Sequence, residues 1–168
     1  QVLFGSAGLR VSRLCFGTLQ LALTDTPPDV AAPLFEHALD IGINLFDTAQ
    51  SYRTQPHVAA LLARVSRERV VVSTRANCRT RAEMQAAFEE SLGILGTDYI
   101  DVYGIHGASD PADWAGREEA WESVLERKAA GQIRATIVTT HSAAFVEYIA
   151  GVPTVDAVMG IHNMTGFG

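Results

Sequence analysis

Four side chains that could take part in acid–base chemistry follow three successive apolar runs of the chain. Asp47 and Tyr52 lie in the stretch NLFDTAQSY, Arg75 ends the run VVVSTR, and His106 follows the run DVYGI. A phenol has a pKa of roughly 10, and a neighbouring cation favours its phenolate form. Arg75, held by a bidentate pair with Asp47, could be that cation, and His106 could hydrogen-bond a substrate oxygen. Such a set would polarise a carbonyl group and move one proton.

Each of these residues also has an ordinary structural interpretation. Asp47 could cap a turn between a strand and a helix, Tyr52 could be a packing residue, and Arg75 could be a surface charge. His106 could be a hydrogen-bonded structural histidine. The four become a candidate site together, because they follow consecutive strands whose ends should meet, and chance seldom gathers ionisable groups in one pocket.

An alternation of short apolar runs and helical segments would position these residues. Strands are predicted at 13–18, 43–48, 69–74, 98–106, 133–140 and 155–161, and helices at 29–41, 56–65, 80–95, 114–130 and 142–150. Thr80 and Glu83 predict a capping box for the third helix, and Gly42, Gly96 and Gly131 lie where helices should end. Strands that alternate with helices indicate parallel βαβ units with right-handed crossovers.

The spacing of the strand ends favours a barrel. Successive gaps of 29, 28, 31 and 33 residues separate Thr18, Asp47, Arg75, His106 and Thr139. A doubly wound sheet would ordinarily carry a glycine-rich phosphate fingerprint in its first turn, and this sequence has none there. We therefore expect an α/β fold: a TIM (β/α)8-type barrel, incomplete, with six parallel strands in a single domain over 1–168. The opening VLFGSAGLRV predicts an N-terminal β-hairpin that closes the end opposite the site.

Composition narrows the class of protein. The 168 residues are 48% hydrophobic and 19% charged, which fits one globular core. A net charge of -6 argues against nucleic acid and anionic membranes as partners, and neither a bilayer-spanning run nor a signal-peptide pattern is evident. Cys15 and Cys78 lack metal-ligand spacing, so we expect no metal site and two reduced core thiols in a cytoplasmic protein.

Six segments resemble the aldo-keto reductases in order and spacing, over essentially the whole chain. They are GLRVSRLCFGT, NLFDTAQSY, VVVSTR, LGTDYIDVYGIHG, KAAGQIRATIVTTHS and VDAVMGIHN. The resemblance implies an oxidoreductase on a TIM barrel that reduces the carbonyl of a small-molecule substrate with NADP(H) or NAD(H). It implies that Tyr52 donates the proton, that Asp47 orients the cation and that His106 orients the substrate.

The resemblance also implies a cofactor site. Gly17 and Thr18 match the first-strand turn that touches the nicotinamide end of the cofactor. Thr139 and Thr140 stand where the family usually has a Ser-Asn pair for the carboxamide. A further departure is Arg75, which replaces the family's lysine. Arginine keeps the positive charge but is fixed in its protonation, so it cannot relay a proton.

Length is the largest departure from the family. The 168 residues hold six βα-type repeats, whereas a barrel has eight in roughly 250 residues. The resemblance assigns the phosphate-binding loops to strands seven and eight, which are absent here. Six strands leave open edges. We therefore expect either a part of a longer protein or a shortened member that forms a homo-oligomer.

Three functions remain open at this point. The first is an NADPH-dependent carbonyl reductase. The second is a cofactor-independent acid–base enzyme, such as a dehydratase, isomerase or cyclase, which would keep Tyr52, Arg75 and His106 as proton-handling and oxyanion-binding groups. The third is a non-catalytic subunit that retains the fold.

Overall fold

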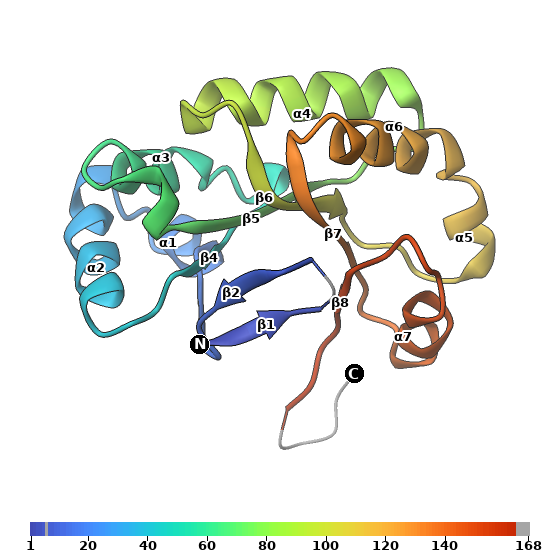
Figure 1. Ribbon diagram of the computed structural model, residues 1–168, viewed down its shortest axis with the longest axis horizontal. Coiled ribbons are helices and arrows are strands. Elements are labelled where there is room, and N and C mark those ends of the chain that lie inside the picture. Colours follow the sequence, from blue (N-terminus) through green and yellow to red (C-terminus); the bar gives the residue numbers. More distant parts are fainter. Residues whose placement is uncertain (6, 164–168) are drawn as a thin grey trace.

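The protein forms a curled sheet of parallel strands with a separate hairpin (Figure 1). The computed structural model describes residues 1–5 and 7–163, so residues 6 and 164–168 of the predicted domain lie outside this description. Within the described residues the sheet has the order β3-β4-β5-β6-β7-β8. Its strands are Cys15–Gly17, Leu45–Asp47, Val71–Ala76, Ile100–Ile105, Ile133–Thr139 and Ala157–Met159. Because sheet order follows chain order without a reversal, the six-stranded incomplete barrel is confirmed.

Helices cover the outer side of the sheet. The longer ones are α2 (Pro28–Asp40), α3 (Gln55–Leu62), α4 (Arg81–Leu95), α6 (Glu118–Ala129) and α7 (Ala143–Ala150). There are also two shorter helices, α1 (Leu19–Leu23) and α5 (Pro111–Ala115), in the described residues. The 3-10 turns are η1 (Gln50–Tyr52) and η2 (Arg67–Arg69). Figure 1 shows α4 and α6 beside one another across the sheet from the hairpin. In the described part of the chain, no helix is long and apolar enough to cross a membrane.

Local sequence signals explain where several helices begin and end. Thr80 accepts from the Glu83 amide at 3.3 Å, and the Glu83 carboxylate accepts from the Thr80 amide at 3.0 Å, so the predicted capping box is confirmed. Gly96 ends α4 in the left-handed region with φ of 64°. The predicted helix at 114–130 is wrong in one respect. It is two helices, because Asp110 caps α5 and buried Arg117 bonds to the Cys78 carbonyl at the break.

The two faces of the sheet pack against different partners. On the outer face, rings including Phe35, Phe46 and Phe88 pack between the helices and the sheet. On the inner face, the hairpin of β1 (Val2–Phe4) and β2 (Leu9–Val11) covers apolar side chains of β5, β6 and β7. The Asn44 carboxamide accepts from the Ser12 amide at 2.7 Å and donates to the Arg10 carbonyl at 3.0 Å, which fixes the hairpin near the start of β4.

The strands β3 and β8 form the edges of the described sheet. Cys15 on β3 is exposed, whereas Cys78 is buried. The prediction of two core thiols is therefore wrong for Cys15. Its neighbour Phe16 faces the outer core, so Cys15 points to the inner face, which is uncovered at this edge.

Candidate active site

A buried ion pair lies at the carboxyl ends of β4 and β5. The Arg75 guanidinium donates from Nη1 to Asp47 Oδ1 at 2.6 Å and from Nη2 to Asp47 Oδ2 at 3.1 Å. The strands pair in parallel with Asp47 opposite Ser73. Arg75 is two residues further along, so it shares the inner face. Ser73 donates to Asp47 Oδ1 at 2.8 Å, and Arg75 also donates to the Thr48 carbonyl at 3.1 Å. Arg75 is 2% exposed, so the Asp47 carboxylate and the Thr48 carbonyl replace water around its two terminal nitrogens.

Tyr52 ends the 3-10 turn that follows β4 and meets the same guanidinium. Arg75 Nη2 donates to the Tyr52 hydroxyl oxygen at 3.1 Å. A buried chain of hydroxyls holds the loop in place, since the Thr54 hydroxyl lies 2.8 Å from that of Thr48 and 2.7 Å from that of Thr18. Arg53 follows in the left-handed region with φ of 58°, which turns the backbone into α3. The tyrosine hydroxyl is thus fixed beside a permanent cation.

His106 follows β6 and lies against Tyr52. The two rings meet edge to face with centroids 5.4 Å apart. The His106 amide donates to the Ala76 carbonyl at 2.9 Å, which extends the pairing of β5 and β6 to this residue. The Ser51 hydroxyl lies 3.2 Å from Nδ1 of the imidazole. The structure therefore brings Asp47, Tyr52, Arg75 and His106 into one cluster at the carboxyl end of the barrel. Their catalytic roles remain predictions.

The surroundings of Arg75 and His106 shift the pKa values of these two side chains in opposite directions. Burial opposes the charge of Arg75, but its hydrogen bonds and its attraction to Asp47, with help from Tyr52, outweigh that cost and raise the pKa of the guanidinium. Burial and the positive charge of Arg75 lower the pKa of His106 to about 4, against a smaller opposing effect of Asp47. At neutral pH the cluster therefore holds a permanent cation and a neutral imidazole, which keeps one N–H donor.

The four predicted cofactor residues differ in what they present. Gly17 has open space where a side chain would begin. Thr139 is the last residue of β7 and is 5% exposed, and its hydroxyl accepts from the Gly107 amide at 3.0 Å. Thr18 is fully buried and donates to the Asp47 carbonyl at 2.9 Å. Thr140 is buried and accepts from the Ser142 amide at 3.0 Å. Gly17 thus offers open space to a flat ring, whereas the three threonines are buried and use their hydroxyls within the protein.

Sequence reasoning missed Ser51 and Ser73. Ser73 could have been found from its place two residues before Arg75 on one strand, because alternate residues share a face. Ser51 had no such signal, since its side chain direction depends on a short 3-10 turn. Among the described residues, no group of three or more His, Cys, Asp or Glu side chains could hold a metal ion.

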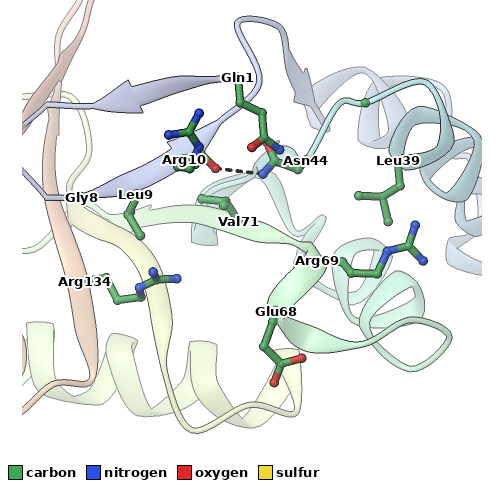
Figure 2. A pocket seen from close by; sticks show the side chains of 11 residues that line it. Gln1, Gly8, Leu9, Arg10, Leu39, Asn44, Glu68, Arg69, Val71 and Arg134 are labelled. Carbon is green, nitrogen blue, oxygen red and sulfur yellow. Dashed lines mark hydrogen bonds between the residues drawn. The ribbon is translucent and has the colours of Figure 1, made fainter.

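A cavity of about 470 Å³ lies away from this cluster, at the amino ends of the strands (Figure 2). Its lining includes Arg10, Arg69 and Arg134. In Figure 2 their guanidinium groups point in different directions, and the Asn44–Arg10 hydrogen bond marks the hairpin at its rim. Arg134 is already paired with Asp101 at 2.7 Å. The cavity therefore presents no convergent set of donors.

Comparison with known proteins gives the family to which this chain belongs. The model of the aldo/keto reductase family matches residues 13–165. Morphine 6-dehydrogenase from Pseudomonas putida is 30% identical, over 76% of this chain and 42% of its own length. Glycerol 2-dehydrogenase (NADP(+)) from Saccharomyces cerevisiae is 31% identical, over 67% of this chain and 36% of its own length.

Solved structures of aldo-keto reductases have a similar fold. The holo form of the aldo-keto reductase AKR11C1 from Bacillus halodurans superposes with a TM-score of 0.81 and 26% identity, covering 96% of this chain and 57% of that chain. The chain belongs to the aldo/keto reductase family. It spans about half the length, or less, of the curated relatives it matches.

Proposed function

We propose that the protein is a reductase that converts the carbonyl group of a small molecule to an alcohol with NADP(H). The observation that carries the proposal is the hydrogen-bonded series from Asp47 through Arg75 to Tyr52, with distances of 2.6 and 3.1 Å. It places a phenolic proton beside a permanent cation. Membership of the aldo/keto reductase family supports reduction, and the yeast relative, a glycerol 2-dehydrogenase (NADP(+)), supports NADP(H).

In this mechanism each residue has a distinct task. Tyr52 gives its proton to the carbonyl oxygen as negative charge develops there. Arg75 stabilises the phenolate that remains, and Asp47 keeps the guanidinium in the orientation this requires. His106, neutral at pH 7, donates a hydrogen bond that directs the carbonyl oxygen toward Tyr52. Because Arg75 cannot give up a proton, Tyr52, which is half-buried, recovers its own from solvent.

The cofactor would lie over Gly17 and against Thr139. The open space at Gly17 admits a flat ring close to the backbone. The Thr139 hydroxyl accepts from Gly107, so its hydrogen can be donated to a carboxamide oxygen. When bound, the nicotinamide supplies the hydride. Thr18 and Thr140 would stabilise the backbone beneath this site. The Thr18 hydroxyl donates to the Asp47 carbonyl, and the Thr140 hydroxyl accepts from the Ser142 amide.

A direct test compares the native full-length protein with Tyr52→Phe. NADPH fluorescence measures binding, and NADPH oxidation with a panel of aldehydes and ketones measures turnover. We expect Tyr52→Phe to bind NADPH like the wild type and to lose turnover by about 10²- to 10⁴-fold. A wild-type protein that neither binds nor oxidises NADPH, or a Tyr52→Phe variant with full turnover, would refute the proposal.

The same experiment addresses the alternatives. A cofactor-independent acid–base enzyme would turn over an enolisable substrate without nucleotide and lose that turnover in Tyr52→Phe. A non-catalytic subunit would keep its biological activity in Tyr52→Phe and His106→Ala. The family membership favours the reductase over both.

The localisation, domain organisation and partners of the protein are part of the same proposal. We place the protein in the cytoplasm as one aldo-keto-reductase-like domain over 1–168, with a small-molecule carbonyl substrate and without nucleic-acid or membrane partners. If the chain is complete, its two edge strands would be covered in a homo-oligomer.

A further inference from the structure

The imidazole of His106 has two nitrogens in different surroundings. Nδ1 lies 3.2 Å from the Ser51 hydroxyl oxygen. Nε2 has no hydrogen-bond partner among residues 1–5 and 7–163. The neutral ring carries a single hydrogen, so one nitrogen donates and the other accepts. Which nitrogen holds that hydrogen decides whether His106 presents a donor or a lone pair to a substrate.

We propose that Ser51 is a positioning residue that donates its hydroxyl hydrogen to Nδ1 and so keeps the hydrogen of His106 on Nε2. The inference rests on the proposed function, in which the imidazole donates to a carbonyl oxygen. It assigns to Ser51 a task that sequence reasoning gave to no residue. A hydrogen bond made by one ring nitrogen is what ordinarily sets the tautomer at the other.

The geometry of the turn holds the Ser51 hydroxyl where it can donate to Nδ1. In the described part of the chain, Nδ1 is the one hydrogen-bond partner of the Ser51 hydroxyl, so no other acceptor among these residues competes for its hydrogen. The turn itself is fixed on both sides of Ser51. The Tyr52 amide donates to the Ala49 carbonyl at 3.0 Å, and the Arg53 amide donates to the Gln50 carbonyl at 3.2 Å. The hydroxyl is therefore presented to the ring by a constrained backbone.

The same turn holds the ring from a second direction. Tyr52, the next residue, meets His106 edge to face at an interplanar angle of 86°, and its hydroxyl oxygen is bound by Arg75. Ser51 and Tyr52 thus fix two features of His106 at once, its tautomer and its tilt. A positive charge on the ring is disfavoured by burial and by Arg75, so the choice between the two neutral tautomers is the one that matters near neutral pH.

A spectroscopic test needs neither cofactor nor substrate. Proton–nitrogen correlation spectra of the native protein labelled with the heavy nitrogen isotope distinguish a protonated from an unprotonated ring nitrogen, and His106→Gln identifies the signals of His106. We expect a protonated Nε2 in the wild type and in Ser51→Thr, which keeps the hydroxyl. In Ser51→Ala we expect partial transfer of the hydrogen to Nδ1. A wild type protonated at Nδ1, or a Ser51→Ala spectrum identical to the wild type, overturns the inference.

Kinetics with NADPH and a carbonyl substrate supply the second readout. Loss of a part of the competent tautomer reduces the apparent efficiency in proportion to its population. We expect Ser51→Ala to lower kcat/KM for the carbonyl by roughly two- to tenfold, with the Kd for NADPH unchanged and with Ser51→Thr close to the wild type. The control Ser66→Ala, on the exposed turn before η2, should change neither. Unchanged kinetics in Ser51→Ala contradict a positioning role. Expected spectra without NADPH oxidation refute the proposed function and leave the tautomer assignment standing.

Discussion

The two ends of the barrel interior contain side chains of opposite character, apolar at one end and charged at the other. At the amino end, Leu9 of the hairpin packs in one apolar cluster with Val71 and Val102. At the carboxyl end, Asp47 and Arg75 are also buried, but they are charged and joined by hydrogen bonds of 2.6 and 3.1 Å. The side chains of the apolar end contribute stability through burial. The charged end has a desolvation cost that only its pairing offsets.

At the amino end of the inner face the side chains serve stability alone, whereas at the carboxyl end stability and the candidate chemistry depend on the same side chains. Along β6, the inward-facing positions pass from Val102 through Gly104 to His106, that is, from the apolar end to the charged end. Substitutions at the amino end should therefore lower the free energy of unfolding without altering the site. Substitutions at the carboxyl end should alter both, because each charge there depends on its partner.

The largest effect is expected for Asp47→Ala. The substitution leaves the Arg75 guanidinium buried without its carboxylate. The free energy of unfolding should fall by about 3–5 kcal/mol, and turnover should be lost because Arg75 is no longer oriented toward Tyr52. Urea unfolding and NADPH oxidation measure the two effects. Asp40→Ala is the matched control, since Asp40 is 72% exposed and its nitrogen–oxygen distance to Arg69 is 3.9 Å. A stability loss as small as that of the control would contradict the comparison.

The next effect tests the apolar end. Leu9 is 1% exposed and packs on the inner face of the sheet, so Leu9→Ala should lower the free energy of unfolding by about 2–5 kcal/mol. The Kd for NADPH and the kcat of the remaining folded protein should stay at wild-type values, measured well below the unfolding midpoint. Leu3→Ala, at a side chain 63% exposed, serves as control and should change stability little. A reduced kcat in Leu9→Ala would show that the two ends are coupled.

Some features of both ends of the barrel could be predicted from the sequence, and others could not. The order of strands and the capping box followed from periodicity and local chemistry, which is why α4 begins at Arg81 as expected. The meeting of Asp47 with Arg75 followed from strand ends and residue type, because parallel neighbours share an edge. The break at Arg117 did not follow, since a tertiary hydrogen bond to the Cys78 carbonyl accompanies it. Ser51 was missed for a similar reason, as a turn and not a periodic element aims its side chain.

A smaller effect is expected where the two ends meet, at Gly104. A Cβ atom at this position would lie 1.8 Å from the Ile137 carbonyl oxygen of β7. Gly104→Ala must therefore push two paired strands apart, at a cost of about 1–3 kcal/mol, and should also lower kcat because His106 is two residues away. Gly93→Ala in α4 is the control. It has open space at the same atom, and alanine favours a helix, so we expect a gain of about 0.5–1 kcal/mol. Thermal unfolding compares the two, and equal effects would contradict the close strand approach.

The smallest effect concerns the pH dependence of stability at the charged end. Burial and Arg75 lower the pKa of His106 to about 4, below its ordinary value of 6.5. The unfolded chain therefore binds a proton at a higher pH than the folded protein does. The contribution of His106 to stability is fully present above pH 6.5 and is lost as the pH falls toward 4. Urea unfolding between these values should show a shallower loss of stability in His106→Gln than in the wild type.

The control for this measurement is His37→Gln, at an exposed histidine of α2. Its pH profile should match that of the wild type, because that side chain is exposed to solvent. If both variants flatten the profile equally, the environment of His106 is no different from that of a surface histidine. Burial at the charged end would then not lower the pKa of His106. If His106→Gln alone flattens it, the imidazole is held neutral by its neighbours, which is the state a hydrogen-bond donor to a carbonyl oxygen requires.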